Sequence, residues 1–147
     1  MVGYDKETSL RAIEIAHQYD CCYAAIGFHP TEIFDVTEED YQEVMSHVDD
    51  EKVVAIGEIG LDYHWIKDPI QREIEKEWFI RQIYFANEHH LPICIHNRDS
   101  NEDCFNILKE VSQTVCPTVV SMVFDVDERI VYWCENRNYQ DIKTYQL

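Results

Sequence analysis

Four short runs of consecutive apolar residues recur along this chain, and amphipathic segments separate them. The runs are CYAAIGF, VVAIG, LPICI and TVVSMVF, at residues 22–28, 53–57, 91–95 and 118–124. Because they do not alternate with polar residues, they are typical of parallel strands that are buried on both faces of a sheet. The sequence therefore predicts an α/β fold in which helices cover a parallel sheet and the crossovers are right-handed.

Amphipathic segments fill the intervals between these runs. Asp5 and Thr37 are residue types that cap helix N-termini, and apolar residues recur at helical spacing after each of them. The expected helices follow Asp5, run from Thr37 to about His47, cover residues 70–89, run from Ser100 to about Val111, and cover residues 127–134. Strand and helix alternate throughout, so the sequence predicts a single domain over residues 1–147.

The charge of the chain limits the partners of such a domain. With 12 Lys and Arg against 29 Asp and Glu, the formal net charge of the 147 residues is −17. Nucleic-acid and anionic-membrane surfaces need clustered Lys and Arg, so this charge argues against a general binder of either kind. The negative charge is still compatible with a phosphate substrate that metal ions hold locally.

Further features of the sequence bear on its location in the cell. No run approaches the roughly 18 apolar residues of a membrane span, so we expect no membrane partner. The first residues lack the cationic and apolar regions of a signal peptide. The six cysteines form no CxxC pair and show no disulfide spacing. Reduced thiols and a cytoplasmic protein are therefore expected.

Three residues that can bind a metal ion or transfer a proton follow three successive apolar runs. His29 follows the first run, Glu58 the second and His96 the third. Because the carboxyl ends of parallel strands lie at one face of the fold, these side chains should converge. For any one of them alone, a polar residue that only caps a loop is the simpler interpretation. Their equivalent positions favour a shared functional site.

Several stretches, in this order, resemble the motifs of the TatD family of metal-dependent deoxyribonucleases. GEIGLDY at residues 57–63 is the most specific of them, and IGFHP at 26–30 and LPICIHNRD at 91–99 also match. The resemblance implies a partial TIM (β/α)8 barrel with about five parallel strands and intervening helices. Val2–Asp5 also resembles the end of the family's second strand, and Gln71, Trp78, Phe79, Gln82 and Ala86 resemble its helix pattern.

The resemblance covers strands two to six of the family's eight-stranded barrel. It matches well over residues 1–110 and diverges over 111–147, where Met122 stands at the position of a metal-binding histidine. The family's opening H-x-H ligands would precede residue 1, and its late aspartate ligand would follow the last residue. Two expected metal ligands are left, Glu58 and His96. We therefore expect weak metal binding and little turnover by this chain alone.

The resemblance also implies a reaction and a set of site residues. The chain would hydrolyse phosphodiester bonds of DNA with divalent metal ions (Mg²⁺, Mn²⁺ or Zn²⁺). Glu58 would be a catalytic residue that bridges the ions, and His96 would bind them through a ring nitrogen. His29 would be catalytic or contact the substrate phosphate, and Arg98 would bind that phosphate through its forked N–H groups. Asp62 would orient a neighbouring residue.

Other interpretations of these residues stay open. Glu58 could bond backbone amides, His96 could be a buried structural histidine, and Arg98 could pair with a carboxylate. The chain could be a catalytically inactive relative that acts as a binding module or has no role, or it could hydrolyse a substrate other than nucleic acid. Five strands cannot close a barrel, so open sheet edges at residues 1–4 and 119–124 predict self-association.

Overall fold

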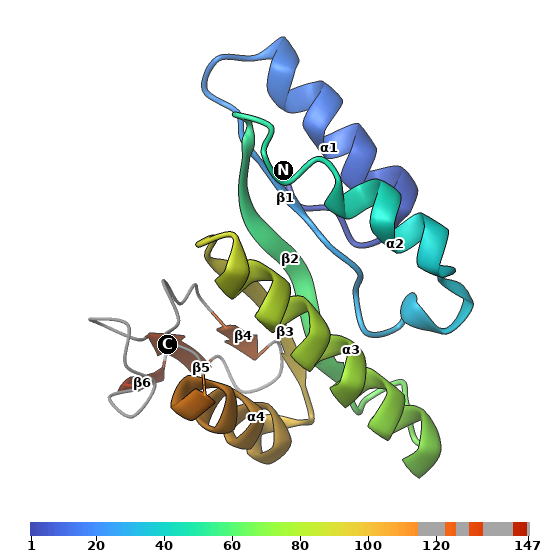
Figure 1. Ribbon diagram of the computed structural model, residues 1–147. Coiled ribbons are helices and arrows are strands. Elements are labelled where there is room, and N and C mark those ends of the chain that lie inside the picture. The colour runs from blue at the N-terminus through green and yellow to red at the C-terminus, as the bar shows by residue number, and fades with distance from the viewer. Residues whose placement is uncertain (115–122, 126–129, 134–142, 147) are drawn as a thin grey trace.

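The computed structural model describes residues 1–114, 123–125, 130–133 and 143–146, with side chains as far as residue 111 (Figure 1). The described strands form one sheet in the order β1-β2-β3-β4-β5-β6, which is also their order in the chain. Their bounds are β1 (Ala24–Ile26), β2 (Val53–Asp62), β3 (Ile93–Arg98), β4 (Val123–Asp125), β5 (Ile130–Trp133) and β6 (Lys143–Gln146).

Helices connect the first four strands, as the sequence predicts. Asp5 and Thr37 each accept the backbone N–H of the third residue after them, so both expected N-caps are confirmed as reciprocal capping boxes. The long helix begins with a proline after its N-cap Asp68. The described helices are α1 (Lys6–Gln18), the 3-10 turn η1 (Ile33–Asp35), α2 (Glu38–Met45), α3 (Pro69–Glu88) and α4 (Asn101–Thr114).

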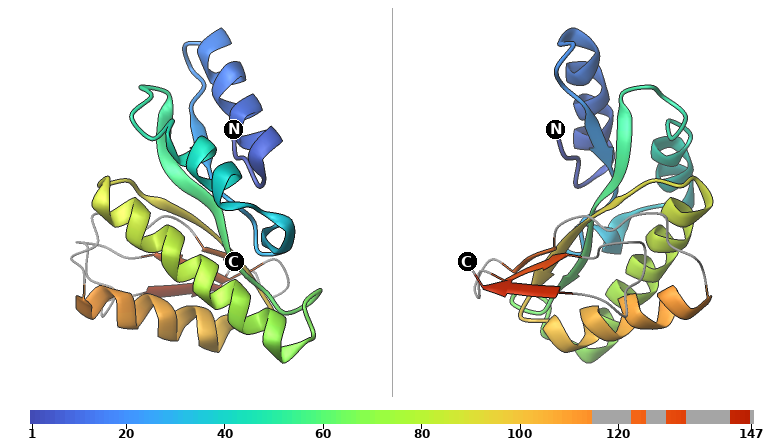
Figure 2. Two further views of the ribbon diagram at one scale, coloured as in Figure 1. Left: turned by 45° about the vertical axis from the view of Figure 1, so that its right-hand side comes forward. Right: turned by 90° about the vertical axis from the view of Figure 1, so that its left-hand side faces the viewer.

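The strands from β1 to β4 pair in parallel, which confirms the predicted α/β class. The N-terminal stub adds one parallel bridge, between Val2 and Ala25 at the outer side of β1. Figure 2 shows α3 and α4 along one side of β2 and β3, as in a segment of a barrel whose helices form the outer layer. The stub therefore lies where a further parallel strand was expected.

Two expectations about the C-terminal part are wrong. Residues 130–133 form the antiparallel strand β5 instead of a helix, because Ile-Val-Tyr-Trp is a run of β-branched and aromatic residues that fits a sheet better than a helix. β4 is not an edge of the sheet, because β5 pairs with it and β6 pairs with β5. The described edge on this side of the sheet is therefore β6.

Two strands extend beyond the apolar runs that predicted them, so two of the candidate site residues lie inside the sheet. β2 continues to Asp62 and β3 to Arg98, so Glu58 and His96 lie within strands and not after them. Along β3, burial alternates strictly between buried and half-buried residues. The expectation that this strand is buried on both faces is therefore wrong: Cys94, His96 and Arg98 share the half-buried face.

Two buried polar side chains of α3 hold the strand ends that carry the site. The amide of Gln82 accepts the N–H of Phe28 at 2.9 Å and donates to its carbonyl oxygen at 3.0 Å. Glu75 accepts the N–H of Asp62 at 3.1 Å. These two side chains are seven residues apart, so they lie on one face of the helix. α3 thereby fixes the ends of β1 and β2 relative to each other.

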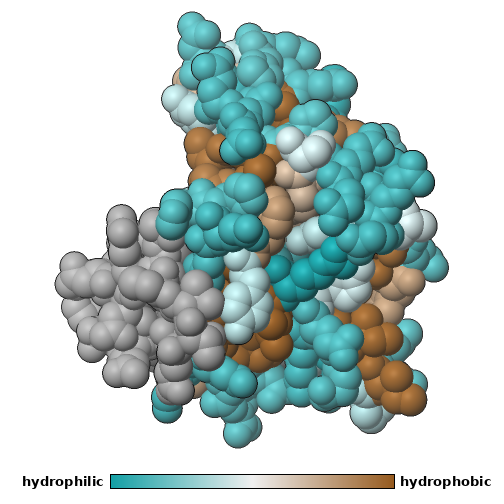
Figure 3. Space-filling view, in the orientation of Figure 1, coloured by the Kyte–Doolittle hydropathy of each residue, from teal (hydrophilic) through white to brown (hydrophobic). Residues whose placement is uncertain are grey.

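The described surface is hydrophilic over most of the view in Figure 3, with hydrophobic residues visible between the helices. Met1, Val2 and Val54 are among the apolar side chains with large exposed fractions. Among the described helices, none combines the length and the apolar character that crossing a membrane requires.

Glu75 makes the stability of the fold depend on pH. The side chain is fully buried, and its Oε2 atom has no hydrogen-bond partner in the described part of the chain. Burial raises the pKa of Glu75 to about 7, from 4.5 for an ordinary glutamate. The folded state therefore holds a proton that the unfolded state releases, and this contribution to stability is lost as the pH rises from about 4.5 through 7.

Replacing Glu75 by glutamine should remove this loss, because the amide keeps an acceptor for Asp62 and carries no charge. As the pH rises from 5 to 8, the unfolding free energy of the unchanged chain should fall, relative to that of Glu75→Gln, by on the order of 3 kcal/mol. Urea denaturation at several pH values measures this difference. Glu77→Gln, at an exposed position of the same helix, is the control. A difference that does not change with pH would contradict the prediction.

Candidate metal centre

Three side chains from neighbouring elements of the sheet meet at one point. His29 follows β1, Glu58 lies in β2, and His96 lies in β3. One ligand atom from each lies within 4.8 Å of the others. The convergence that the strand positions predict is therefore confirmed as geometry, although the chemical role of each residue stays a prediction.

Glycines let the backbones of β2 and β3 come close enough for this arrangement. Gly60 has a φ of 149°, a conformation that side chains disfavour. A Cβ atom at this position would lie 1.9 Å from the carbonyl oxygen of His96. A Cβ atom at Gly57 would lie 2.5 Å from the Cβ of Cys94. The two glycines of the GEIG segment therefore allow β2 to pack closely against β3.

His96 lies between two carboxylates. Its Nδ1 is 3.3 Å from Oε1 of Glu58, and its Nε2 is 2.9 Å from Oδ2 of Asp62. Burial alone would lower the pKa of His96, but the bonds to the two carboxylates outweigh it and raise this pKa. The same bond to His96 lowers the pKa of Glu58, so the Glu58 carboxylate is ionised. The Asp62 contact agrees with the expectation that Asp62 orients a neighbour.

His29 approaches His96 edge-on, with 4.2 Å between the ring centroids. Its Nδ1 lies 2.9 Å from Oγ1 of Thr31 and accepts the backbone N–H of Thr31 at 3.2 Å. Burial, together with the charge of His96, lowers the pKa of His29 to about 4. The His29 ring is therefore neutral at pH 7.

The chemistry of the three side chains fits a divalent cation. A neutral imidazole offers one nitrogen lone pair, and a carboxylate offers two oxygens, one of which can bridge to a second ion. Glu58 is ionised and half-buried, so its charge is partly shielded from water. Asp62 supplies the outer hydrogen bond that often orients a metal-binding histidine.

Arg98 lies on the same face of β3 as His96, two residues further along the strand. Its guanidinium carbon is 6.0 Å from the centre of the Trp65 ring. Trp65 is 67% exposed, and its backbone N–H donates to Asp62. Arg98 is therefore placed beside the cluster but does not belong to it. Met122 lies outside the described residues.

Two contacts of the site have no signal in the sequence. Thr31 follows the HP dipeptide and looks like an ordinary turn residue, but it bonds the ring of His29. Glu75 occupies a charged stretch of α3 and looks solvated, but it is buried beneath Asp62. Because both contacts join segments whose relative positions depend on tertiary packing, periodicity alone could not find them.

Comparison with known proteins assigns the chain first to a class and then to a family. The chain has a parallel α/β sheet with a cluster of nitrogen and oxygen donors of the kind that can hold a metal ion, and relatives with similar sequences are described as metal-dependent hydrolases. A family model described as TatD related DNase matches residues 1–138, and the chain belongs to this family.

Individual relatives agree with this assignment. The chain is 54% identical over 110 residues to the uncharacterized metal-dependent hydrolase YabD of Bacillus subtilis, which covers 75% of this chain and 42% of that protein. It is 28% identical over 109 residues to the 3'-5' ssDNA/RNA exonuclease TatD of Shigella flexneri, with 74% and 41% covered. The chain thus spans less than half the length of these curated relatives.

Solved structures show the same fold. The crystal structure of YJJV, a TatD homolog from Escherichia coli K12, superposes with a TM-score of 0.65 at 29% identity, over 75% of this chain and 42% of that chain. A hydrolase TatD family protein from Entamoeba histolytica gives the same TM-score at 27% identity, over 77% and 40%. The expected partial barrel is therefore confirmed.

Proposed function

We propose that the chain carries part of a metal-dependent phosphodiesterase site that acts on DNA. The observation that carries the proposal is the convergence of His29, Glu58 and His96 within 4.8 Å. Relatives described as a deoxyribonuclease and as an ssDNA/RNA exonuclease support nucleic acid as the substrate. The net charge of −17 would repel DNA over most of the surface, so the substrate must be held locally at this site.

Each residue of the proposed site has a distinct task. A bound divalent cation, whether Mg²⁺, Mn²⁺ or Zn²⁺, would acidify a water molecule and neutralise charge on the phosphate. Glu58 and His96 would hold it, while Asp62 keeps the ring of His96 in place. Arg98 would hold a phosphate oxygen through its forked N–H groups. His29 would contact the same phosphate.

Further parts of the proposal concern the chain as a whole. Only two of the family's expected ligands belong to this chain, so we propose that metal binding by the isolated chain is weak. The described cysteines are free, which is compatible with the reducing conditions of the cytoplasm. Self-association through the sheet edges at the N-terminal stub and at β6 stays a prediction.

An assay of DNA hydrolysis tests the proposed activity. The chain, at high concentration, should release nucleotides from a single-stranded oligonucleotide when Mn²⁺ or Mg²⁺ is present and not when EDTA is added. His96→Asn should abolish this release, whereas His47→Asn, in the turn after α2, should leave it unchanged. Release that is independent of metal, or that survives His96→Asn, would contradict the proposal.

The second candidate function is that of an inactive relative that binds without turnover. The observation in its favour is that Met122 stands where the family has a metal-binding histidine, and a thioether is a poor ligand for a hard cation. Oligonucleotide binding without any metal-dependent release of nucleotides would favour this function.

A further inference from the structure

The turn after β2 presents a tryptophan to solvent beside the candidate site. Trp65 is 67% exposed, and among the large apolar side chains of the described residues only Ile70 is more exposed. Tryptophan is strongly buried on average in folded proteins, so an indole ring left in water needs a reason. Its position in the fold offers one, because Trp65 lies three residues beyond Asp62, the last residue of β2.

One carboxylate joins this turn to the candidate site. Oδ1 of Asp62 accepts the backbone N–H of Trp65 at 3.0 Å, and Oδ2 of the same side chain lies 2.9 Å from Nε2 of His96. The backbone of Trp65 is therefore only two hydrogen bonds away from the cluster. A substrate that is held at the cluster would have the indole ring within its reach.

The backbone on both sides of Trp65 is held in place although its ring is exposed. Nζ of Lys67 donates to the carbonyl oxygen of Tyr63 at 2.7 Å. Nε of Arg72 donates to the carbonyl oxygen of Ile66 at 2.9 Å. A turn that is held in this way does not have to be ordered when a ligand arrives, which lowers the cost of binding to the ring.

The charges around Trp65 indicate what kind of ligand fits the ring. The guanidinium carbon of Arg98 is 6.0 Å from the ring centre, and Lys67 and Arg72 bind the carbonyl groups of the same turn. Three of the 12 Lys and Arg residues thus gather at one turn of a chain whose net charge is −17. An aromatic ring beside cationic side chains is how proteins bind single-stranded nucleic acid, in which a flat base and an anionic phosphate are joined by a sugar.

The neighbours of Trp65 do not occupy this position. The ring of His64 meets the indole ring at 87°, so the two rings do not stack. The carboxylate of Asp99 lies 3.3 Å from the ring of His64, and that of Asp68 accepts the N–H of Ile70 at 2.7 Å. These two acidic side chains are therefore engaged in other contacts, and the exposed indole ring is accessible to a base.

We propose that the indole ring of Trp65 stacks on an unpaired base of the nucleic-acid substrate, next to the phosphate that Arg98 would hold. The inference rests on the proposed function for the kind of ligand, and it adds a residue that binds the base. Stacking needs only the flat face of a base, so Trp65 would accept all four bases with little preference. A base inside a duplex is covered on both faces by its neighbours and would not stack on the ring.

Binding of a short uncleavable substrate tests this contact. By calorimetry with Mn²⁺ present, a trithymidylate with phosphorothioate linkages should bind Trp65→Ala about 5- to 100-fold more weakly than the unchanged chain. Trp65→Phe keeps a flat ring and should recover a large part of the affinity. Tyr19→Ala, which removes an exposed aromatic ring before the amino end of β1, is the matched control and should bind like the unchanged chain. Equal binding by Trp65→Ala and the unchanged chain would overturn the proposal.

Removal of single bases from the trinucleotide shows whether the ring contacts a base. At one of the three positions, an abasic nucleotide should weaken binding by about the same factor as Trp65→Ala. At that position the two changes together should cost no more than either alone, because they remove the same contact. Losses that multiply at every position would overturn the proposal, since Trp65 would then act without touching a base.

The outcomes also separate this inference from the proposed function. If the chain releases nucleotides with Mn²⁺ but Trp65→Ala binds the trinucleotide as tightly as the unchanged chain, only the inference fails. If Trp65→Ala weakens binding but no nucleotide is released, the inference stands and the proposed hydrolysis fails. If the unchanged chain binds no trinucleotide, both fail. A dimer that dissociates in Trp65→Ala, with unchanged binding of the trinucleotide, would overturn the inference and assign the ring to a contact with a second copy of the chain.

Discussion

Glu58→Gln is expected to weaken the binding of Mn²⁺ by at least about 10- to 100-fold, the range measured for residues that only support a metal ligand. Glutamine keeps the size of the side chain but removes its charge and the second oxygen that can bind an ion. Because the bond to His96 lowers the pKa of Glu58, the charge is present over the whole neutral range. Calorimetric titration of the two chains with Mn²⁺ measures the loss.

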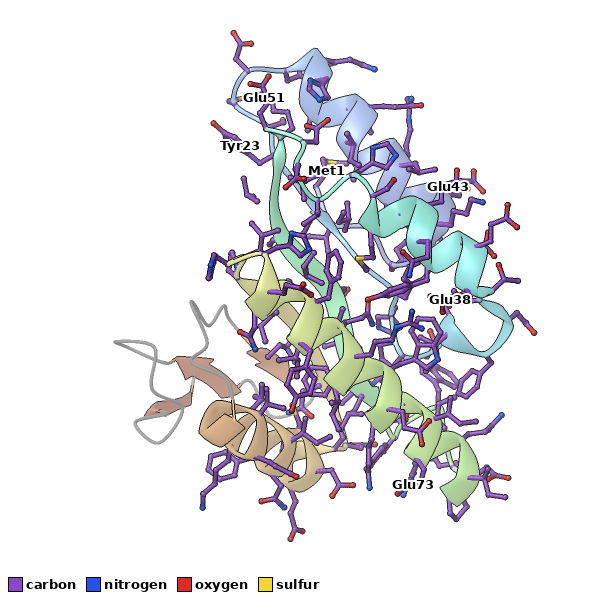
Figure 4. The ribbon with its side chains drawn as sticks, in the orientation of Figure 1. Met1, Tyr23, Glu38, Glu43, Glu51 and Glu73 are labelled. Carbon is purple, nitrogen blue, oxygen red and sulfur yellow. The ribbon has the colours of Figure 1, made fainter. Side chains whose placement is uncertain are left out.

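Glu51→Gln is the matched control for this experiment. Glu51 is exposed and precedes β2 at its amino end, near Tyr23, so it lies away from the cluster (Figure 4). The same loss of charge there should leave the affinity for Mn²⁺ nearly unchanged. Equal losses in both variants would show that Mn²⁺ responds to the net charge of −17 and not to a site at Glu58.

Gly60→Ala is expected to destabilise the fold by on the order of 4 kcal/mol, from the strain of an unfavourable φ and from overpacking against β3. The new Cβ atom would lie 1.9 Å from the carbonyl oxygen of His96, so β2 and β3 would have to separate. Urea denaturation followed by circular dichroism measures the change. Because a small domain is stabilised by only about 5–15 kcal/mol, the variant could lose a large part of its stability.

Gly27→Ala provides the comparison, because a Cβ atom there would lie 3.0 Å from the backbone of Gly57 and needs only a small shift. We expect its loss of stability to be clearly smaller than that of Gly60→Ala. Equal stabilities of the two variants would show that the contact of Gly60 with β3 relaxes easily.

The sequence was sufficient to predict the parallel part of the fold. Apolar runs and N-cap residues such as Asp5 and Thr37 are local signals, and they give the strands and helices up to α4 within a few residues. The ends of β2 and β3 were missed because hydrogen bonding continues through Glu58 and His96, which hydropathy does not register. β5 was expected as part of a helix, although its four residues are β-branched or aromatic and favour a strand.

The candidate site was predictable in its members but not in its contacts. The positions of His29, Glu58 and His96 after apolar runs predict that they meet, since parallel strands bring equivalent positions together. The resemblance implies that Asp62 orients a neighbour, and Asp62 does contact the ring of His96. The bond from the Thr31 backbone to the ring of His29 depends on the turn after β1, which no local pattern encodes.

Because α3 forms hydrogen bonds to the residues that end two strands, this one helix supports both sides of the site. Through Gln82 it acts on the residue that precedes His29, and through Glu75 it acts on the residue that orients His96. A tilt of the helix would therefore change the separation of the two imidazoles, even though no residue of α3 belongs to the cluster. Substitutions on the buried face of α3 would change the geometry of the site without contacting it. A search for variants that inactivate the site should therefore include these positions as well as the ligands.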